Sequence, residues 1–209
     1  MTAPSIVILD LSVTDYETTW RAMQAFSATR NSESADELWL TQHDAVYTLG
    51  LNRKNVRLPN RGDIPVILTD RGGKITYHGV GQVIIYLLLD LKRRQLSIRQ
   101  LVTMIENTII ELLAKHNIAA TARQDAPGVY VDDRKIASLG LRLKNNVCYH
   151  GLSLNVNMDL TPFTAIDPCG YEGLQMTQTS ALGMQQTPQQ VGEVLVAALA
   201  EKLNILENA

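Results

Sequence analysis

The sequence predicts an α+β fold in which helices flank a mixed or antiparallel sheet. Three observations indicate this class: amphipathic helical patterns, one continuous apolar run, and several short strands joined by tight polar turns. Of the 209 residues, 45% are hydrophobic, which is enough to bury a full core. Because domains usually contain about 100 to 200 residues, we expect residues 1–209 to form a single domain.

Helices are expected in three places, the first over about 15–29, and each begins with residue types that open helices. Two of the openings have the spacing of a capping box, in which two side chains three residues apart each bond the other's backbone N–H. Apolar residues follow at helical intervals. The three openings are Thr14 with Glu17, Ser97 with Gln100, and Thr187 with Pro188.

The continuous apolar run 83–89 is typical of a strand buried on both faces. From residue 128 the pattern indicates an antiparallel meander, because the Asp and Asn pairs at 132–133 and 145–146 tolerate hairpin turns. The polar segment 175–190 is expected to be a surface loop or hinge. The remaining strands are predicted at 37–42, 45–51, 64–69, 128–131, 135–143 and 147–158.

Charge and cysteine content argue against several classes of function. A net charge of −2 does not suit a general nucleic-acid binder, which would carry a basic excess on one face. No stretch approaches the roughly 18 apolar residues of a membrane span, and no signal peptide is evident, so we expect a cytoplasmic protein without a membrane partner. The two cysteines and four histidines show no metal-ligand spacing, so no metal site is expected.

Cys169 is the candidate nucleophile, because the turn DPCG at 167–170 can expose its thiol. Lys135, in an earlier strand, would favour the ionised thiol if the fold brings the two together. A single cysteine in a turn is more often incidental, and spacing alone cannot place Lys135 beside it. Cys148 lies in a predicted strand, where a free cysteine usually behaves as a small buried hydrophobe.

A glycine-rich segment, RGGKITYHGVGQ at 71–82, precedes the apolar run and matches neither a P-loop nor a dinucleotide-binding motif. Its glycines suit a wide hairpin, whereas its basic and aromatic side chains beside a buried strand are typical of a pocket wall. Two patches of small residues, 138–140 and 150–153, should lie near each other if their strands pair. Their glycines would then either form simple bulges or line a narrow channel. His78 and His150 are candidates for proton transfer or for structural hydrogen bonds.

Five ordered blocks of sequence resemble the lipoyl(octanoyl) transferases, which move an octanoyl group from acyl carrier protein to lipoyl domains. The blocks extend from residue 71 to residue 173, and the resemblance covers nearly the whole chain. Any one block alone would be weak evidence. The blocks are RGGKITYHGVGQ at 71–82, DAPGVYV at 125–131, RKIASLGLRL at 134–143, HGLSLNVNMDL at 150–160 and DPCGYEG at 167–173.

The resemblance implies the fold of biotin protein ligases and lipoate ligases, which is similar to that of class II synthetases. It implies an acyltransferase that takes octanoyl from the phosphopantetheine arm of acyl carrier protein. The implied acceptor is a specific lysine of the lipoyl domains in 2-oxoacid dehydrogenase E2 subunits and in the glycine cleavage H protein. This is the first step of endogenous protein lipoylation, and the resemblance implies that it needs neither ATP nor a metal cofactor.

The resemblance also implies roles for residues. Its PCG cysteine, here Cys169, forms an acyl-thioester intermediate, and its KI lysine, here Lys135, favours the thiolate and acts as general base. Val80 stands where the family usually has proline, which loosens the loop without removing a reacting group. The substrate-binding residues that it implies are Arg71, Gly72, Gly73, Lys74, Ile75, Thr76, Tyr77, His78, Ser138, Leu139, Gly140, Gly151, Leu152 and Ser153.

Two other functions stay open at this point. An ATP-dependent lipoate or biotin ligase of the same fold would need no cysteine nucleophile, so the PCG turn favours the transferase. A non-catalytic protein that only binds carrier or lipoyl domains would not be expected to keep both Cys169 and Lys135. An acidic carrier protein needs a local basic patch, although a solvated charged face is the simpler interpretation of either candidate cluster. The two clusters are Lys92, Arg93 and Arg94 with Arg99, and Arg53, Lys54 and Arg57 with Arg61.

Overall fold

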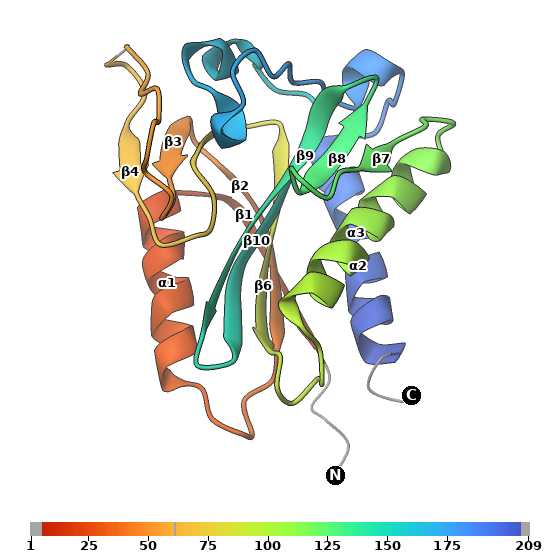
Figure 1. The fold of residues 1–209 in the computed structure, drawn as a ribbon. Helices are drawn as coiled ribbons and strands as arrows, with labels where there is room; N and C mark the ends of the chain where they lie inside the picture. The colour runs from red at the N-terminus through yellow and green to blue at the C-terminus, as the bar shows by residue number, and fades with distance from the viewer. Residues whose placement is uncertain (1–5, 61, 206–209) are drawn as a thin grey trace.

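The structure, a computed structural model, describes residues 6–60 and 62–205 (Figure 1). These residues form a large sheet, a small sheet and three α-helices, with α1 (Tyr16–Thr29) on one face of the large sheet and α2 (Ile98–Ala114) and α3 (Pro188–Ile205) on the other. The strands are β1 (Val7–Thr14), β2 (Glu37–His43), β3 (Val46–Leu49), β4 (Val66–Leu68), β5 (Ile75–His78), β6 (Gln82–Asp90), β7 (Thr121–Ala122), β8 (Gly128–Val131), β9 (Arg134–Lys144) and β10 (Val147–Asn155).

The large sheet is mixed, as the sequence predicted. Its order is β1-β2-β6-β10-β9-β8-β7, in which β1 pairs with β2 in parallel and the other neighbours pair antiparallel. The small sheet has the order β4-β3-β5. Strands β8, β9 and β10 form the expected meander, so the predicted α+β class is confirmed.

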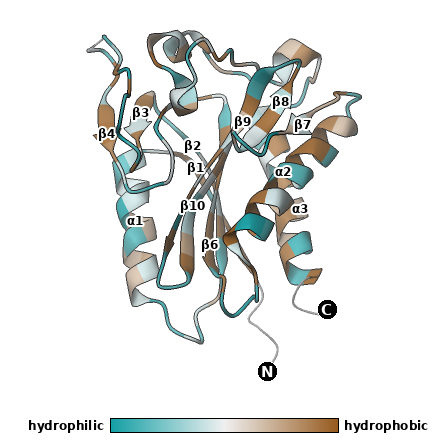
Figure 2. Cartoon of the chain, viewed as in Figure 1, coloured by the Kyte–Doolittle hydropathy of each residue, from teal (hydrophilic) through white to brown (hydrophobic). Residues whose placement is uncertain are grey.

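β6 lies in the middle of the large sheet and is buried on both faces because helices cover both. Its odd-numbered side chains from Val83 to Leu89 join the core under α2 and α3, whereas the even-numbered ones from Ile84 to Leu88 join the core under α1. Hydropathy colouring shows apolar residues along the central strands and in α2 and α3 (Figure 2). This double burial explains why the run 83–89 is continuously apolar rather than alternating.

The capping box of α2 is present as predicted, with Ser97 Oγ accepting from the Gln100 backbone N–H. The predicted cap of α1 is wrong by one residue, because Asp15 Oδ1 accepts from the Thr18 N–H at 2.8 Å. Thr14 ends β1 instead, and its hydroxyl bonds that of Thr41 in β2 at 2.9 Å. The hydroxyl that would cap the helix is therefore used within the sheet.

Two segments differ from the sequence predictions. β1 was not expected, because this edge strand exposes most of its side chains and so lacks the alternation of a half-buried strand. The segment 175–190 is only partly a surface loop. Its first residues run beside Lys135, and Thr177 and Thr179 are buried. The backbone of this segment pairs with that of Lys135, and its polar composition gives no sign of such pairing.

Candidate active site

Cys169 lies in a short 3₁₀ turn (Pro168–Gly170) and has a left-handed backbone with φ +57°, which side-chain-bearing residues rarely adopt. Gly170 follows with φ +81°, and a β-carbon there would lie 2.4 Å from Lys74 Cδ. Gly170 thus permits both its own positive φ and the close approach of the Lys74 stem, whereas Cys169 holds a conformation that its side chain disfavours. The Cys169 side chain is half-buried and lines the pocket described below.

Arg57 holds the segment that leads into this turn. Its Nε lies 3.0 Å from Asp167 Oδ1, and its Nη2 donates to the Ile166 carbonyl at 2.7 Å and to the Thr164 carbonyl at 3.0 Å. Arg57 comes from the loop after β3, so a residue distant in sequence fixes the approach to Cys169.

Lys135 reaches Cys169 from the start of β9. Its Nζ lies 3.3 Å from Cys169 Sγ and donates to the Pro127 carbonyl at 2.9 Å, and the side chain is fully buried. Gly128 leaves room for it, because a β-carbon at that position would lie 2.5 Å from Lys135 Cε. The structure therefore brings together the thiol and the amine that sequence spacing alone could not place.

The backbone of Lys135 is held by the chain that follows the cysteine. Its N–H donates to the Gln175 carbonyl, and its carbonyl accepts from the Thr177 N–H, each at 2.9 Å. Glu106 of α2 supports the opposite side, with Oε1 accepting from the Gly128 N–H at 2.8 Å. Burial raises the pKa of Glu106, against the attraction of Lys135. Sequence reasoning missed Glu106, although an acidic residue inside the apolar stripe of α2 was a visible signal.

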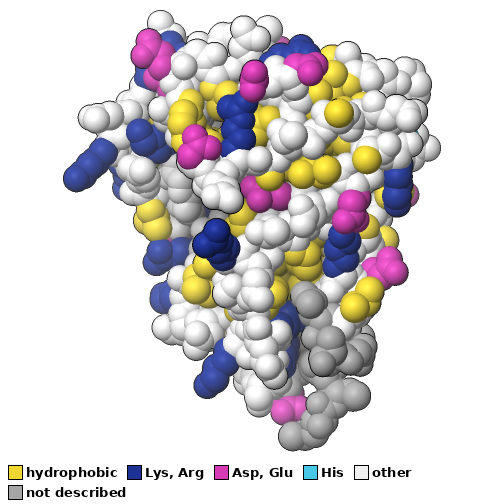
Figure 3. Space-filling model, turned by 45° about the vertical axis from the view of Figure 1, so that its right-hand side comes forward, with side chains coloured by type: hydrophobic (Ala, Val, Ile, Leu, Met, Phe, Trp, Pro, Cys, Tyr) yellow, Lys and Arg dark blue, Asp and Glu magenta, His cyan; other side chains and the backbone are white. Residues whose placement is uncertain are grey.

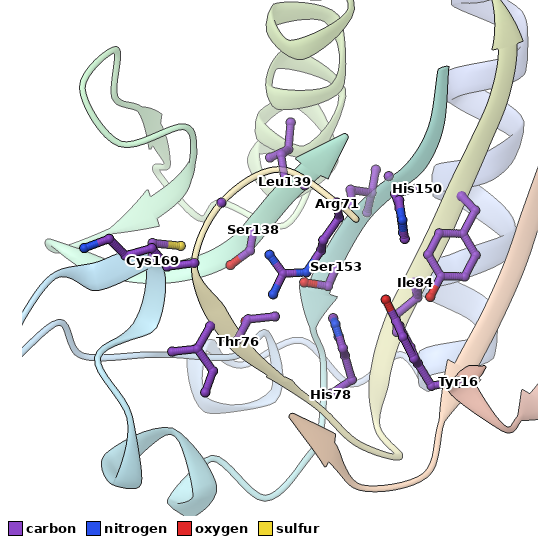
Figure 4. Close-up of a pocket in the computed structure, with 17 residues that line it drawn as sticks. Tyr16, Arg71, Thr76, His78, Ile84, Ser138, Leu139, His150, Ser153 and Cys169 are labelled. Atoms are coloured by element: carbon purple, nitrogen blue, oxygen red, sulfur yellow. The ribbon is translucent and has the colours of Figure 1, made fainter. Parts of the chain in front are cut away.

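A pocket extends from Cys169 across the α1 face of the large sheet (Figure 4). Its floor is made of pairs in register: Ser138 faces Ser153, and Gly140 faces Gly151. The predicted meeting of the two small-residue patches is thus confirmed. The predicted residues that line the pocket are Arg71, Gly73, Lys74, Ile75, Thr76, His78, Ser138, Leu139, Gly140, His150, Gly151, Leu152, Ser153 and Cys169.

Four predicted residues make their main contacts outside the pocket, although Leu139 and Leu152 are also among its lining residues. Leu139 and Leu152 belong to the core under α2 and α3, and Figure 4 shows the Leu139 side chain pointing away from the pocket centre. Gly72 donates its N–H to the Leu141 carbonyl, and Tyr77 packs in a separate apolar cluster with Tyr47. Neither Gly72 nor Tyr77 lines the pocket.

A chain of hydrogen bonds supports the pocket wall. Arg71 Nε donates to Thr48 Oγ1 at 3.0 Å, and Thr48 Oγ1 lies 3.3 Å from His78 Nε2. His78 Nδ1 lies 2.7 Å from Gln82 Oε1, and Gln82 Nε2 donates to Asn155 Oδ1 at 2.9 Å. Because Gln82 Oε1 can only accept, the proton of the neutral imidazole is on Nδ1. His78 therefore makes structural hydrogen bonds within the wall while its side chain also lines the pocket.

His150 also takes a structural position, with Nε2 2.9 Å from Asp70 Oδ1. Its φ of +62° interrupts the alternation of β10, so that the neighbouring Tyr149 hydroxyl also donates to Asp70. Burial alone would raise the pKa of the Asp70 carboxyl, but hydrogen bonds from His150, Tyr149 and Trp20 hold it well below its usual range. Sequence reasoning missed Asp70, which follows a predicted strand with no motif to mark it.

Three further pocket residues were not predicted: Tyr16, Ile84 and Tyr86. Ile84 and Tyr86 had the signature of core positions in an apolar run, and Tyr16 that of the first residue of a helix. Cys148, in contrast, is fully buried as expected, and burial raises the pKa of its thiol to about 12. Only one of the two thiols is therefore suited to nucleophilic chemistry.

Comparison with known proteins matches residues 15–200 to the lipoyl protein ligase A/B catalytic domain. The chain is 54% identical over 196 residues to a protein named octanoyltransferase from Shewanella sp. (strain W3-18-1), a match that covers 94% of this chain and 90% of the relative. A protein of the same name from Shewanella putrefaciens matches with the same identity and coverage.

Solved structures with the same fold include a putative lipoate protein ligase from T. acidophilum with bound lipoic acid. Its TM-score is 0.77 at 14% identity, over 96% of this chain and 86% of that one. Biotin protein ligase from Aquifex aeolicus in complex with biotin and ATP has a TM-score of 0.59 at 14% identity, over 98% of this chain and 72% of that one. The predicted biotin and lipoate ligase fold is confirmed.

Residues 6–60 and 62–205 offer neither a membrane-spanning helix nor a cluster of metal-binding side chains. None of the helices there is long and apolar enough to cross a membrane. No three His, Cys, Asp or Glu side chains in those ranges gather as ligands for a metal ion.

Proposed function

Since the chain belongs to the octanoyltransferase family, within the lipoyl protein ligase A/B catalytic domains, we propose that it transfers octanoyl from acyl carrier protein to a lysine of lipoyl domains. The observation that carries the proposal is the 3.3 Å contact between the buried Lys135 amine and the Cys169 thiol at the pocket. Such a pair suits covalent catalysis, in which one transfer is divided into two steps.

In the first step the Cys169 thiolate attacks the thioester carbonyl of the octanoyl donor. The carbon–sulfur bond to the phosphopantetheine arm breaks, and the departing thiolate takes the proton of the Lys135 ammonium. Before the attack, the Lys135 ammonium lies 3.3 Å from the sulfur, where it attracts the negative charge of a thiolate. Lys135 thus stabilises the nucleophile without a metal ion.

In the second step the amine of the acceptor lysine attacks the Cys169 thioester. Neutral Lys135 takes the proton that this amine loses, and Cys169 leaves as a thiolate beside the restored ammonium. The product amide is more stable than the thioester, so the energy of the donor drives the transfer and ATP is not needed. The proton returns to Lys135, and each cycle begins from the same state.

The basic residues in the loop after β3 are better placed to bind an acidic carrier protein than the basic cluster at 92–94. Asp36, which is fully buried, accepts from Arg93 and Arg94 as well as from Arg30, so two members of that cluster form a structural ion group. In Figure 1 the loop after β6 also lies at the opposite end of the sheet from the turn that holds Cys169.

In the loop after β3, Arg53 and Lys54 are exposed, whereas Arg57 is committed to the cysteine turn and Arg61 lies outside the described residues. Figure 3 shows Lys and Arg side chains scattered over the face that it draws, rather than gathered in one patch. We therefore propose that the carrier protein docks at Arg53 and Lys54, in the same loop as the Arg57 that bonds the segment before the cysteine turn.

The test is the intact mass of the protein after brief incubation with octanoyl-acyl carrier protein and no ATP. Wild type and Cys148→Ala should each gain one octanoyl group that hydroxylamine removes, and Cys169→Ala should gain none. Lys135→Ala should remain folded but form the adduct far more slowly. An adduct that persists in Cys169→Ala would refute the proposed nucleophile.

The same experiment separates the transferase from an ATP-dependent ligase of this fold. If modification of a lipoyl domain appeared only with free octanoate or lipoate and ATP, the chain would be a ligase. If neither set of substrates gave any product, the chain would be a binding protein.

A further inference from the structure

The pocket described above ends at a wall that the comparisons and the family resemblance leave without a role. We propose that Ile84 and Tyr86 of β6, roofed by Tyr16 of α1, set the length of acyl chain that the enzyme accepts. The inference deepens the proposed function and rests on it, because it concerns the far end of the same pocket.

The floor of the pocket runs across three strands. Ser138 in β9 faces Ser153 in β10, and Ser153 faces Ile84 in β6. A second row lies two residues along each strand, where Gly140 faces Gly151 and Gly151 faces Tyr86. Small residues therefore make the floor of the trough over β9 and β10, where the Arg71 side chain would lie 3.1 Å from a β-carbon at Gly140, and large residues stop it at β6.

Beyond β6 the same face is filled. Tyr86 faces Trp39 of β2, and both belong with Ile84 to the apolar cluster under α1. Above the wall, the rings of Tyr16 and His78 stack with centroids 5.9 Å apart. Figure 4 shows Tyr16 and Ile84 on the side of the pocket away from Cys169.

The polar atoms of this wall have partners inside the protein. The Tyr86 hydroxyl lies 2.7 Å from His43 Nε2, and the Tyr16 hydroxyl donates to Thr69 Oγ1 at 3.3 Å. Since these atoms are engaged, the rings offer mainly carbon to whatever fills the pocket. An apolar tail end can contact this wall without leaving a buried polar group unpaired.

The length of the trough matches a medium-length chain. Neighbouring strands lie about 4.8 Å apart, so the distance from β9 across β10 to β6 is about 10 Å. Cys169 Sγ enters at the β9 side, because the Lys135 Nζ that it contacts would lie 2.9 Å from a β-carbon at Gly128, and Gly128 faces Ser138. With carbon–carbon bonds of about 1.5 Å in zigzag, an extended octanoyl group spans about 9 Å from carbonyl to methyl. A chain two carbons longer would run into Ile84 and Tyr86.

The test is competition among hexanoyl, octanoyl, decanoyl and dodecanoyl carriers for acylation of Cys169, read as relative rates by intact mass. Each buried methylene is worth about 0.8 kcal/mol, or roughly a fourfold change in binding. Ile84→Ala should therefore raise the ratio of decanoyl to octanoyl rates by about 15-fold. Ser153→Val, which fills the trough over β10, should instead shift the preference toward hexanoyl.

The matched control is Ile85→Ala, because Ile85 is the next residue of β6 and packs on the opposite face under α2 and α3. It loses the same side chain from the core but should keep the wild-type preference within about twofold. If Ile84→Ala does not fold, Ile84→Val and Ile85→Val give the same comparison with a smaller shift.

Equal preferences in the Ile84 and Ile85 variants would overturn the inference, as would a uniform loss of rate at every chain length. If wild type reacts with octanoyl carrier protein but all variants keep the same chain-length preference, Ile84 and Tyr86 do not set the acyl length. The proposed function would still stand. Wild type that reacts with no acyl carrier would refute the proposed function, and the inference with it.

Discussion

His78 is a buried neutral histidine whose protonation should destabilise the protein in acid. Burial lowers the pKa of His78 from 6.5 to about 3, and the nearby Arg71 acts in the same direction. Between these values the folded protein binds fewer protons than the unfolded chain, so its stability is fully present above pH 6.5 and is lost as the pH falls toward 3. At 1.36 kcal/mol per pKa unit, the loss at pH 5 is about 2 kcal/mol.

The assay is urea unfolding of wild type and His78→Asn at pH 7.5 and pH 5. Asparagine keeps an N–H donor near the position of Nδ1, which bonds Gln82 Oε1, but it cannot take up a proton. The variant should be less stable at pH 7.5, yet its loss on acidification should be smaller than that of wild type by about 2 kcal/mol. Equal losses in the two proteins would show that His78 is not the group that titrates.

Three further perturbations test other parts of the structure. Asp36→Asn removes the anion that three arginines share, so urea unfolding should show a loss of about 3 to 5 kcal/mol, and a loss below about 1 kcal/mol would contradict the ion group. Gly128→Ala places a β-carbon 2.5 Å from Lys135 Cε, so acyl-enzyme formation should slow by about a hundredfold. Arg57→Ala should slow acylation while changing stability by less than about 1 kcal/mol, because its ion pair is partly exposed. The control Lys54→Ala should raise the KM for carrier protein instead, and identical effects of the two variants would refute the separate roles.

Sequence reasoning succeeded where the signal is local. The capping box at Ser97 and the run 83–89 each report on residues that are neighbours along the chain, and both were confirmed. It failed where tertiary contacts decide the outcome. β1 is an exposed edge strand without the usual pattern, and the Thr14 hydroxyl bonds β2 rather than capping α1.

The candidate site divides in the same way. Fourteen of the predicted residues line one pocket, because the small and polar residues that make a pocket floor stand out in a sequence. Ile84, Tyr86 and Tyr16 did not stand out. An apolar side chain that ends a pocket cannot be told from one that fills a core until the residues packed over it are known.

By itself, the sequence determined the chemical groups: one cysteine in a turn, a lysine in a strand, and two patches of small residues whose pairing followed from the hairpin between them. Only the tertiary structure decided that Lys135 Nζ lies 3.3 Å from Cys169 Sγ, across a separation of 34 residues. The physical reason is that this contact depends on long-range packing. The backbone of Gln175 and Thr177 holds Lys135, and Gly128 leaves room for its side chain. Arg57 fixes the turn that carries Cys169. The spacing of these residues in the sequence does not reveal any of these contacts.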